Sequence, residues 1–183
     1  MTTVLLLAHP TFITSRANRA MLEAVADVPD LEIAELYALY PDGVIDTVAE
    51  RKRLLRADRL IFQFPLQWYS TPALLKQWQD AVLTPLFYFE PTIAAATVGL
   101  PLFAATSTGG PLESYRPGGT AMTIETLFSP LEATARKCRW RWQTPFAVHD
   151  VRNLDDDALA QAGDAYRVAL VSLPVLEMSG QDG

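Results

Sequence analysis

The sequence predicts an α/β fold in which a five-stranded parallel sheet is covered by helices on both faces. Two observations predict it. Short apolar runs alternate with segments of helical periodicity along the whole chain, and this alternation favours parallel strands joined by right-handed crossovers. No linker or internal repeat divides the 183 residues, half of which are hydrophobic. We therefore expect one domain spanning 1–183.

Apolar runs of strand length predict the strands. Most of these runs are continuous, as in strands that are buried on both faces of a parallel sheet. The second run differs, because it alternates apolar and polar residues. The predicted strands are 3–10, 31–39, 59–65, 100–110 and 144–151.

Between these runs, apolar residues recur at helical spacing. The predicted helices are 15–27, 46–58, 70–86, 123–138 and 155–173. Pro130 is expected to interrupt the fourth helix. The expected N-terminal signals are Thr14 or Ser15 for the first helix, a capping box of Thr47 with Glu50 for the second, and Thr71 ahead of Pro72 for the third.

Five alternating strands and helices favour the strand order 2-1-3-4-5, so we predict a flavodoxin-like three-layer sandwich. In such sheets ligands bind beyond the carboxyl ends of the strands, near the switch in strand order. Strands 1, 3 and 4 are neighbours in this order. The loops that follow them should therefore meet at one edge of the sheet and form a single site.

Charge and cysteine content narrow the class of protein. The formal net charge of −6 argues against nucleic acid as a partner, because phosphate backbones require a basic face. Cys138 is the only cysteine, which suits a reducing compartment, and we interpret it as a half-buried small hydrophobic residue and not as a nucleophile. The N-terminus lacks a basic region, and no apolar run reaches the length of a spanning helix. We expect a cytoplasmic protein, without a metal site.

The first loop, AHPTFITSRAN, ends where a helix begins. Unpaired N–H groups and the positive end of the helix dipole make such a position suitable for an anion. His9, Ser15, Arg16 and Asn18 add polar groups, and we interpret the loop as a phosphate cradle. In the alternative reading, Ser15 is only an N-cap and His9 only a polar strand end. The chain contains neither a P-loop nor a G-x-G-x-x-G motif.

The second loop places Gln67, Trp68 and Tyr69 directly after a buried strand. A flat heteroaromatic ring needs an apolar wall and backbone donors, and this loop offers both. Alternatively, both aromatic residues are core plugs or part of a dimer surface. The third loop, STGG, allows a ring to approach its two glycines closely, although it could also be a plain turn.

The stretches AHP, SRAN, PLQWYSTPALLKQW and STGG resemble the motifs of the NAD(P)H-quinone oxidoreductase family of flavodoxin-like flavoproteins. The chain is most similar to the small bacterial members that accompany glutathione-gated potassium-efflux antiporters. The resemblance extends over nearly the whole chain. It implies bound FMN, with FAD as the alternative, and hydride transfer from NAD(P)H through the flavin to a quinone-type acceptor.

The resemblance also implies roles for individual residues. Tyr115 is the catalytic candidate, because its hydroxyl group would stabilise charge on the flavin during hydride transfer. The residues implied to bind the cofactor are His9, Ser15, Arg16, Ala17 and Asn18 at the phosphate, Leu66, Gln67, Trp68 and Tyr69 along the ring, and Ser107, Thr108, Gly109 and Gly110 at its pyrimidine side.

Two stretches depart from the family pattern. RPGGTAM, after Tyr115, offers no match for the histidine that partners this tyrosine in some members. Tyr115 is therefore expected to act alone, or with Arg116 or a water. FYFEPTIAAATVGLP lacks the glycine-rich loop that ends in Gly-Lys in many bacterial members. The resemblance therefore does not define which substrate the protein prefers.

Other functions and an oligomeric state follow from the same residues. The protein could be a flavin-binding regulatory subunit of a membrane potassium-efflux antiporter, a one-electron flavodoxin-type carrier or a flavin-free α/β domain. FYFEPTIAAATVGLPLF and CRWRW carry more apolar surface than one domain edge can bury. We therefore expect a homodimer, and by resemblance the partner chain would close the flavin pocket.

Overall fold

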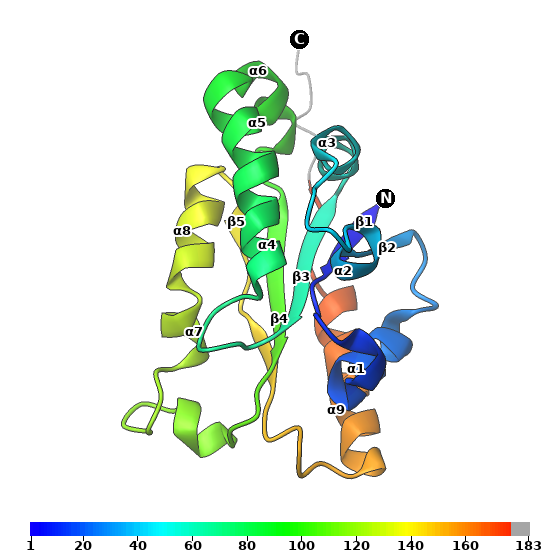
Figure 1. Ribbon diagram of the computed structural model, residues 1–183, viewed down its shortest axis with the longest axis vertical. Helices are drawn as coiled ribbons and strands as arrows, with labels where there is room; N and C mark the ends of the chain where they lie inside the picture. The colour runs from blue at the N-terminus through cyan, green and yellow to red at the C-terminus, as the bar shows by residue number, and fades with distance from the viewer. Residues whose placement is uncertain (177–183) are drawn as a thin grey trace.

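The computed structural model describes residues 1–176; the predicted domain, 1–183, extends beyond them. Its sheet is parallel and has the order β2-β1-β3-β4-β5, with β6 also paired to β4. Figure 1 shows this sheet between two layers of helices. The strands are β1 (Thr3–Leu7), β2 (Leu31–Glu35), β3 (Arg59–Pro65), β4 (Pro101–Ser107), β5 (Arg141–Trp142) and β6 (Phe146–Val148). The predicted fold class and strand order are confirmed.

Two cores lie on opposite faces of the sheet. In β1, Leu5 and Leu7 face the core that contains α1 and α9, while Val4 and Leu6 face the core of the other helices. This alternation explains why the strand is apolar throughout, since both of its faces are covered. The helices are α1 (Arg16–Val25), α2 (Leu36–Leu39), α3 (Thr47–Leu55), α4 (Ala73–Trp78), α5 (Thr84–Phe89), α6 (Pro91–Ala94), α7 (Ile124–Leu127), α8 (Ser129–Lys137) and α9 (Asp156–Val171).

Four predicted strands were wrong in extent. The strand predicted at 3–10 ends at Leu7, and the one predicted at 100–110 covers only Pro101–Ser107. The strand predicted at 31–39 ends at Glu35, because Glu35 pairs with Leu7, the last residue of β1; the chain then turns into α2. The strand predicted at 144–151 is only as long as β6, and β5, which precedes it, was not predicted. These two short strands pair with the two ends of β4. Pro145 lies between them and has no N–H to donate to a sheet.

Two predicted helix caps were also wrong. Asp46 caps α3, because its carboxylate accepts the N–H groups of Val48 and Ala49. The helix at 70–86 begins only at Ala73, and no side chain caps it. Ser15 does cap α1, as predicted.

The third and fourth predicted helices are both interrupted. A π-helical segment, Gln79–Leu83, joins α4 to α5. Pro85 follows it and lacks the N–H that an α-helix would direct at the carbonyl four residues earlier. The wider π-helical turn before Pro85 accommodates this missing hydrogen bond. The interruption expected near Pro130 is confirmed, because Phe128 separates α7 from α8. Across the described residues, no helix combines the length and apolar character needed to cross a membrane.

Candidate functional site

Hydrogen bonds join the three loops that follow β1, β3 and β4. The N–H of Leu66 donates to the carbonyl oxygen of Ser107 at 2.8 Å, which ties the second loop to the third. Asn18 Nδ2 donates to Ser107 Oγ at 2.9 Å, which ties the first loop to the third. The predicted convergence of these loops is therefore present in the fold.

The first loop presents free backbone donors at the start of α1. Ser15 Oγ accepts the N–H of Asn18 at 3.3 Å, but the N–H groups of Arg16 and Ala17 have no hydrogen-bond partner among the described residues. Free N–H groups at the positive end of a helix dipole can bind an anion.

His9 lies beside this loop as a neutral donor. Its Nδ1 accepts the N–H of Thr11 at 3.1 Å, so in the neutral ring the proton is on Nε2. Burial lowers the pKa of His9, although a hydrogen bond to the backbone opposes this effect. Near neutral pH the side chain therefore offers an N–H and no charge.

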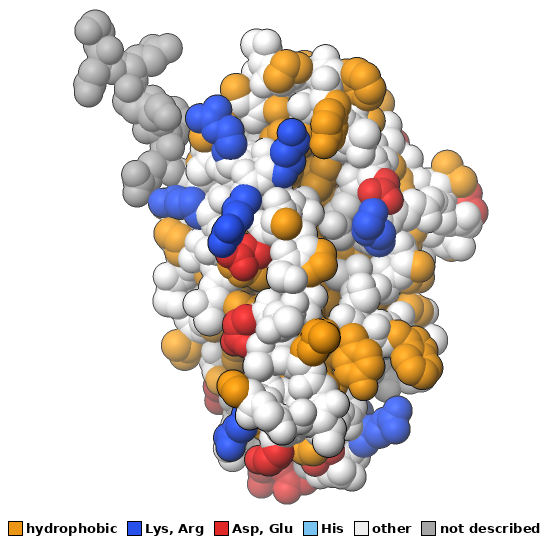
Figure 2. Space-filling model, turned by 90° about the vertical axis from the view of Figure 1, so that its left-hand side faces the viewer, with side chains coloured by type: hydrophobic (Ala, Val, Ile, Leu, Met, Phe, Trp, Pro, Cys, Tyr) orange, Lys and Arg blue, Asp and Glu red, His pale blue; other side chains and the backbone are white. Residues whose placement is uncertain are grey.

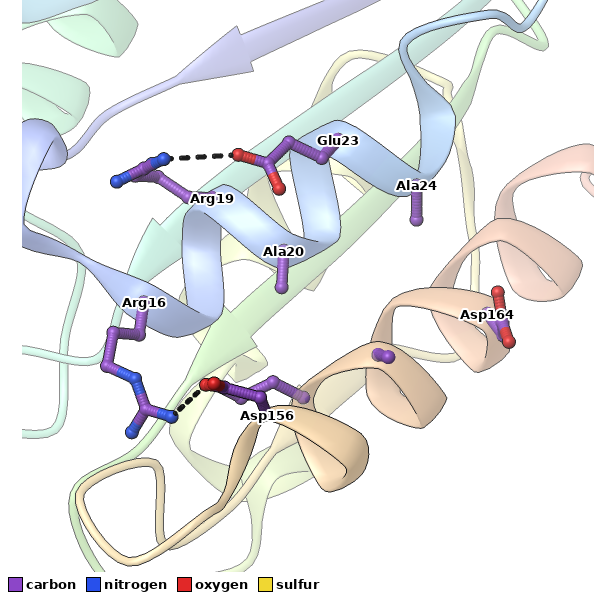
Figure 3. Close-up of a pocket in the computed structure, with 9 residues that line it drawn as sticks. Arg16, Arg19, Ala20, Glu23, Ala24, Asp156 and Asp164 are labelled. Carbon is purple, nitrogen blue, oxygen red and sulfur yellow. Dashed lines mark hydrogen bonds and ion pairs between the residues drawn. The ribbon is translucent and has the colours of Figure 1, made fainter.

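The guanidinium group of Arg16 turns away from the first loop. Figure 3 shows it directed at α9, where it donates to the carbonyl of Leu154 at 2.8 Å and to Asp156 at 2.7 Å. It lines a pocket of about 450 Å³ between α1 and α9. Arg16 thus brings only its backbone N–H to the site.

Asn18 lies beneath the loops and not on their surface. Its side chain is 0% exposed and also donates to Ser15 Oγ at 3.2 Å. Gln63, in β3, supports it from below by donating to the carbonyl of Asn18 at 2.9 Å. Sequence reasoning missed Gln63, although a glutamine inside the apolar run RLIFQFP was a usable signal. These two amides hold the loops together from within the core.

The second loop is a strained hairpin that exposes its aromatic side chains. Gln67 and Ser70 exchange two backbone hydrogen bonds of 3.0 Å. Trp68 and Tyr69 between them have φ values of +47° and +63°, as in a type I′ turn, which usually contains Asn-Gly. Trp68 is 92% exposed and Tyr69 is 52% exposed, so neither aromatic residue is a core plug. The N–H groups of both residues have no partner in the part of the chain that the structure describes.

The third loop offers its backbone and not its side chains. Ser107 and Thr108 are buried, whereas the N–H groups of Gly109 and Gly110 have no partner among residues 1–176. A Cβ atom on Gly110 would lie 3.3 Å from the ring of Tyr115. The glycine therefore allows Tyr115 to lie against the loop.

His149 packs against Tyr115, a contact that sequence reasoning missed. The two rings lie 5.2 Å apart between centroids. His149 follows β6, so it is distant from Tyr115 in sequence, and only the position of AVHD at a strand end could have indicated it. This contact is packing between two rings, so the expectation that Tyr115 acts alone, or with Arg116 or a water, stays a prediction.

Thr108 determines which nitrogen of His149 carries the proton. Its hydroxyl group donates to the carbonyl of Gly110 at 2.8 Å and lies 3.0 Å from His149 Nδ1. Since the hydroxyl proton is already used, Nδ1–H must donate to Thr108, which leaves Nε2 as an acceptor. Burial lowers the pKa of His149, while the nearby charge of Glu113 acts in the opposite direction.

A fourth segment, which follows β6, completes the site. The N–H of Asp150 donates to the carbonyl of Gly110 at 2.9 Å, and the N–H of Val151 donates to the carbonyl of Thr108 at 3.2 Å. These bonds align the segment with the third loop. Sequence reasoning had not assigned it to the site.

Other reactive groups lie outside this edge of the sheet. Cys138 is buried more deeply than predicted, and burial raises the pKa of its thiol to about 12, so it is a poor nucleophile. Residues 1–176 contain no group of three or more His, Cys, Asp or Glu side chains arranged to hold a metal.

Fold and site together define an α/β protein whose strand ends present free N–H groups and exposed aromatic rings. A family model described as flavodoxin-like fold matches residues 1–170. The chain therefore belongs to the flavodoxin-like family, which confirms the kinship predicted from its motifs.

Individual relatives are similar over nearly their full lengths. The glutathione-regulated potassium-efflux system ancillary protein KefF of Klebsiella pneumoniae is 40% identical over 177 residues, which are 97% of this chain and 99% of the relative. A solved NADPH-quinone reductase from P. pentosaceus has a TM-score of 0.84 and 31% identity, and covers 95% of this chain and 100% of its own. General stress protein 14 of Treponema denticola, solved in complex with FMN, has a TM-score of 0.82 and 32% identity over 93% of this chain and 98% of its own.

Proposed function

We propose that the chain is a flavin-dependent oxidoreductase that uses NAD(P)H to reduce a quinone-type acceptor. One observation carries the proposal: three hydrogen-bonded loops present unpaired backbone N–H groups around exposed aromatic side chains. The relatives support FMN over FAD, because one of them was solved with FMN. Quinone as the acceptor rests on the similarity to a reductase of that name.

The described residues fit a flavin at this edge. The N–H groups of Arg16 and Ala17, with His9 Nε2, would hold the phosphate. Trp68 and Tyr69 would line the ring, together with Leu66 and Gln67. The N–H groups of Gly109 and Gly110 would face the pyrimidine side. Ser15, Asn18, Ser107 and Thr108 would act indirectly, because their side chains bond to other parts of the loops.

When bound, the flavin supplies hydride chemistry and the protein supplies orientation and electrostatics. The hydroxyl group of Tyr115 would donate a hydrogen bond at the ring edge where negative charge develops. His149 packs against the ring of Tyr115 and is itself fixed by Thr108. We infer that this pair positions the hydroxyl group.

The visible absorption spectrum of the purified protein tests this function first. We expect the two flavin bands, and chromatography of the released cofactor distinguishes FMN from FAD. Steady-state assays with NADH and NADPH, each with a soluble quinone, then test turnover. A colourless protein that takes up no added flavin would refute the proposal and favour a flavin-free domain.

A second function is favoured by the kinship with the potassium-efflux ancillary protein. In this alternative the chain binds flavin and regulates a membrane antiporter, with little turnover of its own. Full flavin occupancy without quinone turnover, together with stimulation of potassium efflux when the chain is added to a reconstituted antiporter, would support it. Efflux that is unchanged by the added chain would count against it.

We also propose that the protein is a cytoplasmic homodimer without a nucleic-acid partner. Tyr88, Phe89 and Ile93 are exposed, Phe89 by 78%, and Figure 2 shows hydrophobic side chains gathered over α5 and α6 at the upper end of the molecule. CRWRW contributes less than expected, because Trp140 is only 5% exposed. A monomer at micromolar concentration in sedimentation analysis would refute the dimer.

A further inference from the structure

Arg152 lies directly against the third loop. A Cβ atom placed on Gly109 would lie 3.7 Å from Nε, 3.8 Å from Cζ and 4.0 Å from Nη2 of Arg152. The guanidinium group therefore rests beside the backbone of Gly109, which is exposed. Tyr115 lies in the same way against the next residue, Gly110.

The backbone next to Arg152 is held in register with the loop. The N–H groups of Asp150 and Val151 bond to Gly110 and Thr108. Asp150 has a φ of +55°, and its carboxylate accepts Asn153 Nδ2 at 2.8 Å. Asp150 is the acidic residue nearest to Arg152 in sequence, and its carboxylate is directed at Asn153.

Within residues 1–176, the charge of Arg152 has no partner. No hydrogen bond or ion pair joins its side chain to any other residue in the described part of the chain. Most arginines of this protein are paired, as Arg16 is with Asp156. A permanent, weakly hydrated cation with free donors at a ligand-binding edge suits an acceptor that carries negative charge.

We propose that Arg152 stabilises negative charge at the pyrimidine edge of the bound flavin and thereby favours the reduced form. The inference rests on the proposed function. A flavin gains electron density at this edge on reduction, and a cation that is already in position stabilises the reduced form more than the oxidised form. Because Arg152 is exposed, solvent limits the effect to a moderate one.

The test is the midpoint potential of the bound flavin in the full chain, measured by equilibration with a reference dye. Arg152→Gln removes the charge, and Arg152→Lys retains it. Lys52→Gln is the matched control, because it changes the net charge equally at an exposed position on α3. We expect Arg152→Gln to shift the ratio of reduced to oxidised flavin about tenfold towards oxidised, which is about 30 mV for a two-electron couple.

Arg152→Lys should recover most of this shift, and Lys52→Gln should cause none. An unchanged potential in Arg152→Gln, or an equal shift in Lys52→Gln, would overturn the inference. Weaker binding of FMN but not of riboflavin, with an unchanged potential, would show that Arg152 binds the phosphate instead and would also overturn it. If the parent protein binds no flavin, the proposed function itself fails, so the two failures are distinguishable.

Discussion

At the scale of single residues, Trp68 and Tyr69 are held in a conformation that their side chains disfavour. Both residues have positive φ values, and for residues other than glycine the left-handed region costs about 1–2 kcal/mol. The hairpin nevertheless exposes two aromatic rings beside free N–H groups. Strain that is retained at such a position is typical of a functional loop.

Replacing Tyr69 with glycine should relieve this strain. We expect Tyr69→Gly to raise the free energy of unfolding of the flavin-free protein by about 1 kcal/mol, and to weaken flavin binding because part of the wall is lost. Urea denaturation and flavin titration measure the two effects. Ser70→Gly is the control: its φ is not positive, so glycine there should destabilise by about 0.5–1 kcal/mol. A less stable Tyr69→Gly protein would contradict the strain.

The hydroxyl group of Tyr115 should accelerate flavin reduction. Tyr115→Phe keeps the ring against His149 and Gly110 but removes the donor. We expect reduction by NAD(P)H in stopped flow to slow by about tenfold, or about 1–2 kcal/mol, with flavin still bound. His149→Gln should slow it less, because His149 acts through Tyr115. If Tyr115→Phe reduces the flavin at the same rate as the parent protein, the hydroxyl group has no catalytic role and Tyr115 serves only in packing.

At the scale of elements, α1 is the part of the fold that carries the first loop. Its N-terminus provides the free N–H groups of the site, and its other face packs on α9 (Figure 3). This contact is close because Gly163 of α9 lies against the backbone of α1. A Cβ atom on Gly163 would lie 3.0 Å from the carbonyl oxygen of Ala20 and 3.1 Å from Cβ of Ala24.

Gly163→Ala should therefore destabilise the protein. Alanine improves helix propensity by about 1 kcal/mol, but crowding in a packed interface costs about 1–3 kcal/mol, and we expect the crowding to dominate. Urea denaturation measures the difference. Asp164→Ala, at the exposed neighbouring position, should change the free energy of unfolding by less than about 0.5 kcal/mol. A gain in stability in Gly163→Ala would show that the helices separate without cost.

Removal of the polar groups beneath the first loop should weaken flavin binding. Ser15→Ala removes the cap of α1, at a cost of about 0.5–2 kcal/mol. Asn18→Ala also leaves Ser107 without its buried donor, at a cost of about 1–3 kcal/mol. We expect the double variant to lose both stability and flavin affinity. Asp46→Ala removes a comparable cap from α3 and should leave the affinity unchanged; unchanged affinity in the double variant would refute the phosphate cradle.

At the scale of the whole molecule, two half-buried histidines link stability to pH. Burial lowers the pKa values of His9 and His149 below 6.5. Just below pH 6.5 the unfolded chain therefore binds more protons than the folded one, so acid favours unfolding. Their contribution to stability is complete above about pH 6.5 and is lost as the pH falls through the lowered values.

The free energy of unfolding, measured in urea, should therefore decrease as the pH is lowered from about 7 to about 5. His9→Gln and His149→Gln together should flatten this dependence, and each single substitution should remove part of it. A double variant with the slope of the parent would assign the dependence to other groups.

The features that depend on short-range pattern could be predicted from the order of the amino acids. The alternation of apolar runs and helical segments was sufficient for the α/β class and the strand order, because each element buries its own face. Ser15 was recognisable as a cap, and the ends of three strands were recognisable as loops of one site. The residue types in these loops then indicated hydrogen-bond donors and an aromatic wall for a bound ring.

Which side chains the loops share, and where these side chains point, is visible only in the folded structure. Gln63 of β3 supports Asn18 of α1. His149 contacts Tyr115 although the two residues are distant in sequence. Arg152 lies beside Gly109 because the segment after β6 is hydrogen-bonded to the third loop. The sequence suggests the guanidinium group of Arg16 as a phosphate ligand, yet this group binds Asp156 of α9 and leaves only the backbone N–H for the site. Such contacts join residues that are distant in sequence, and their geometry is set by packing between elements, which no local spacing encodes.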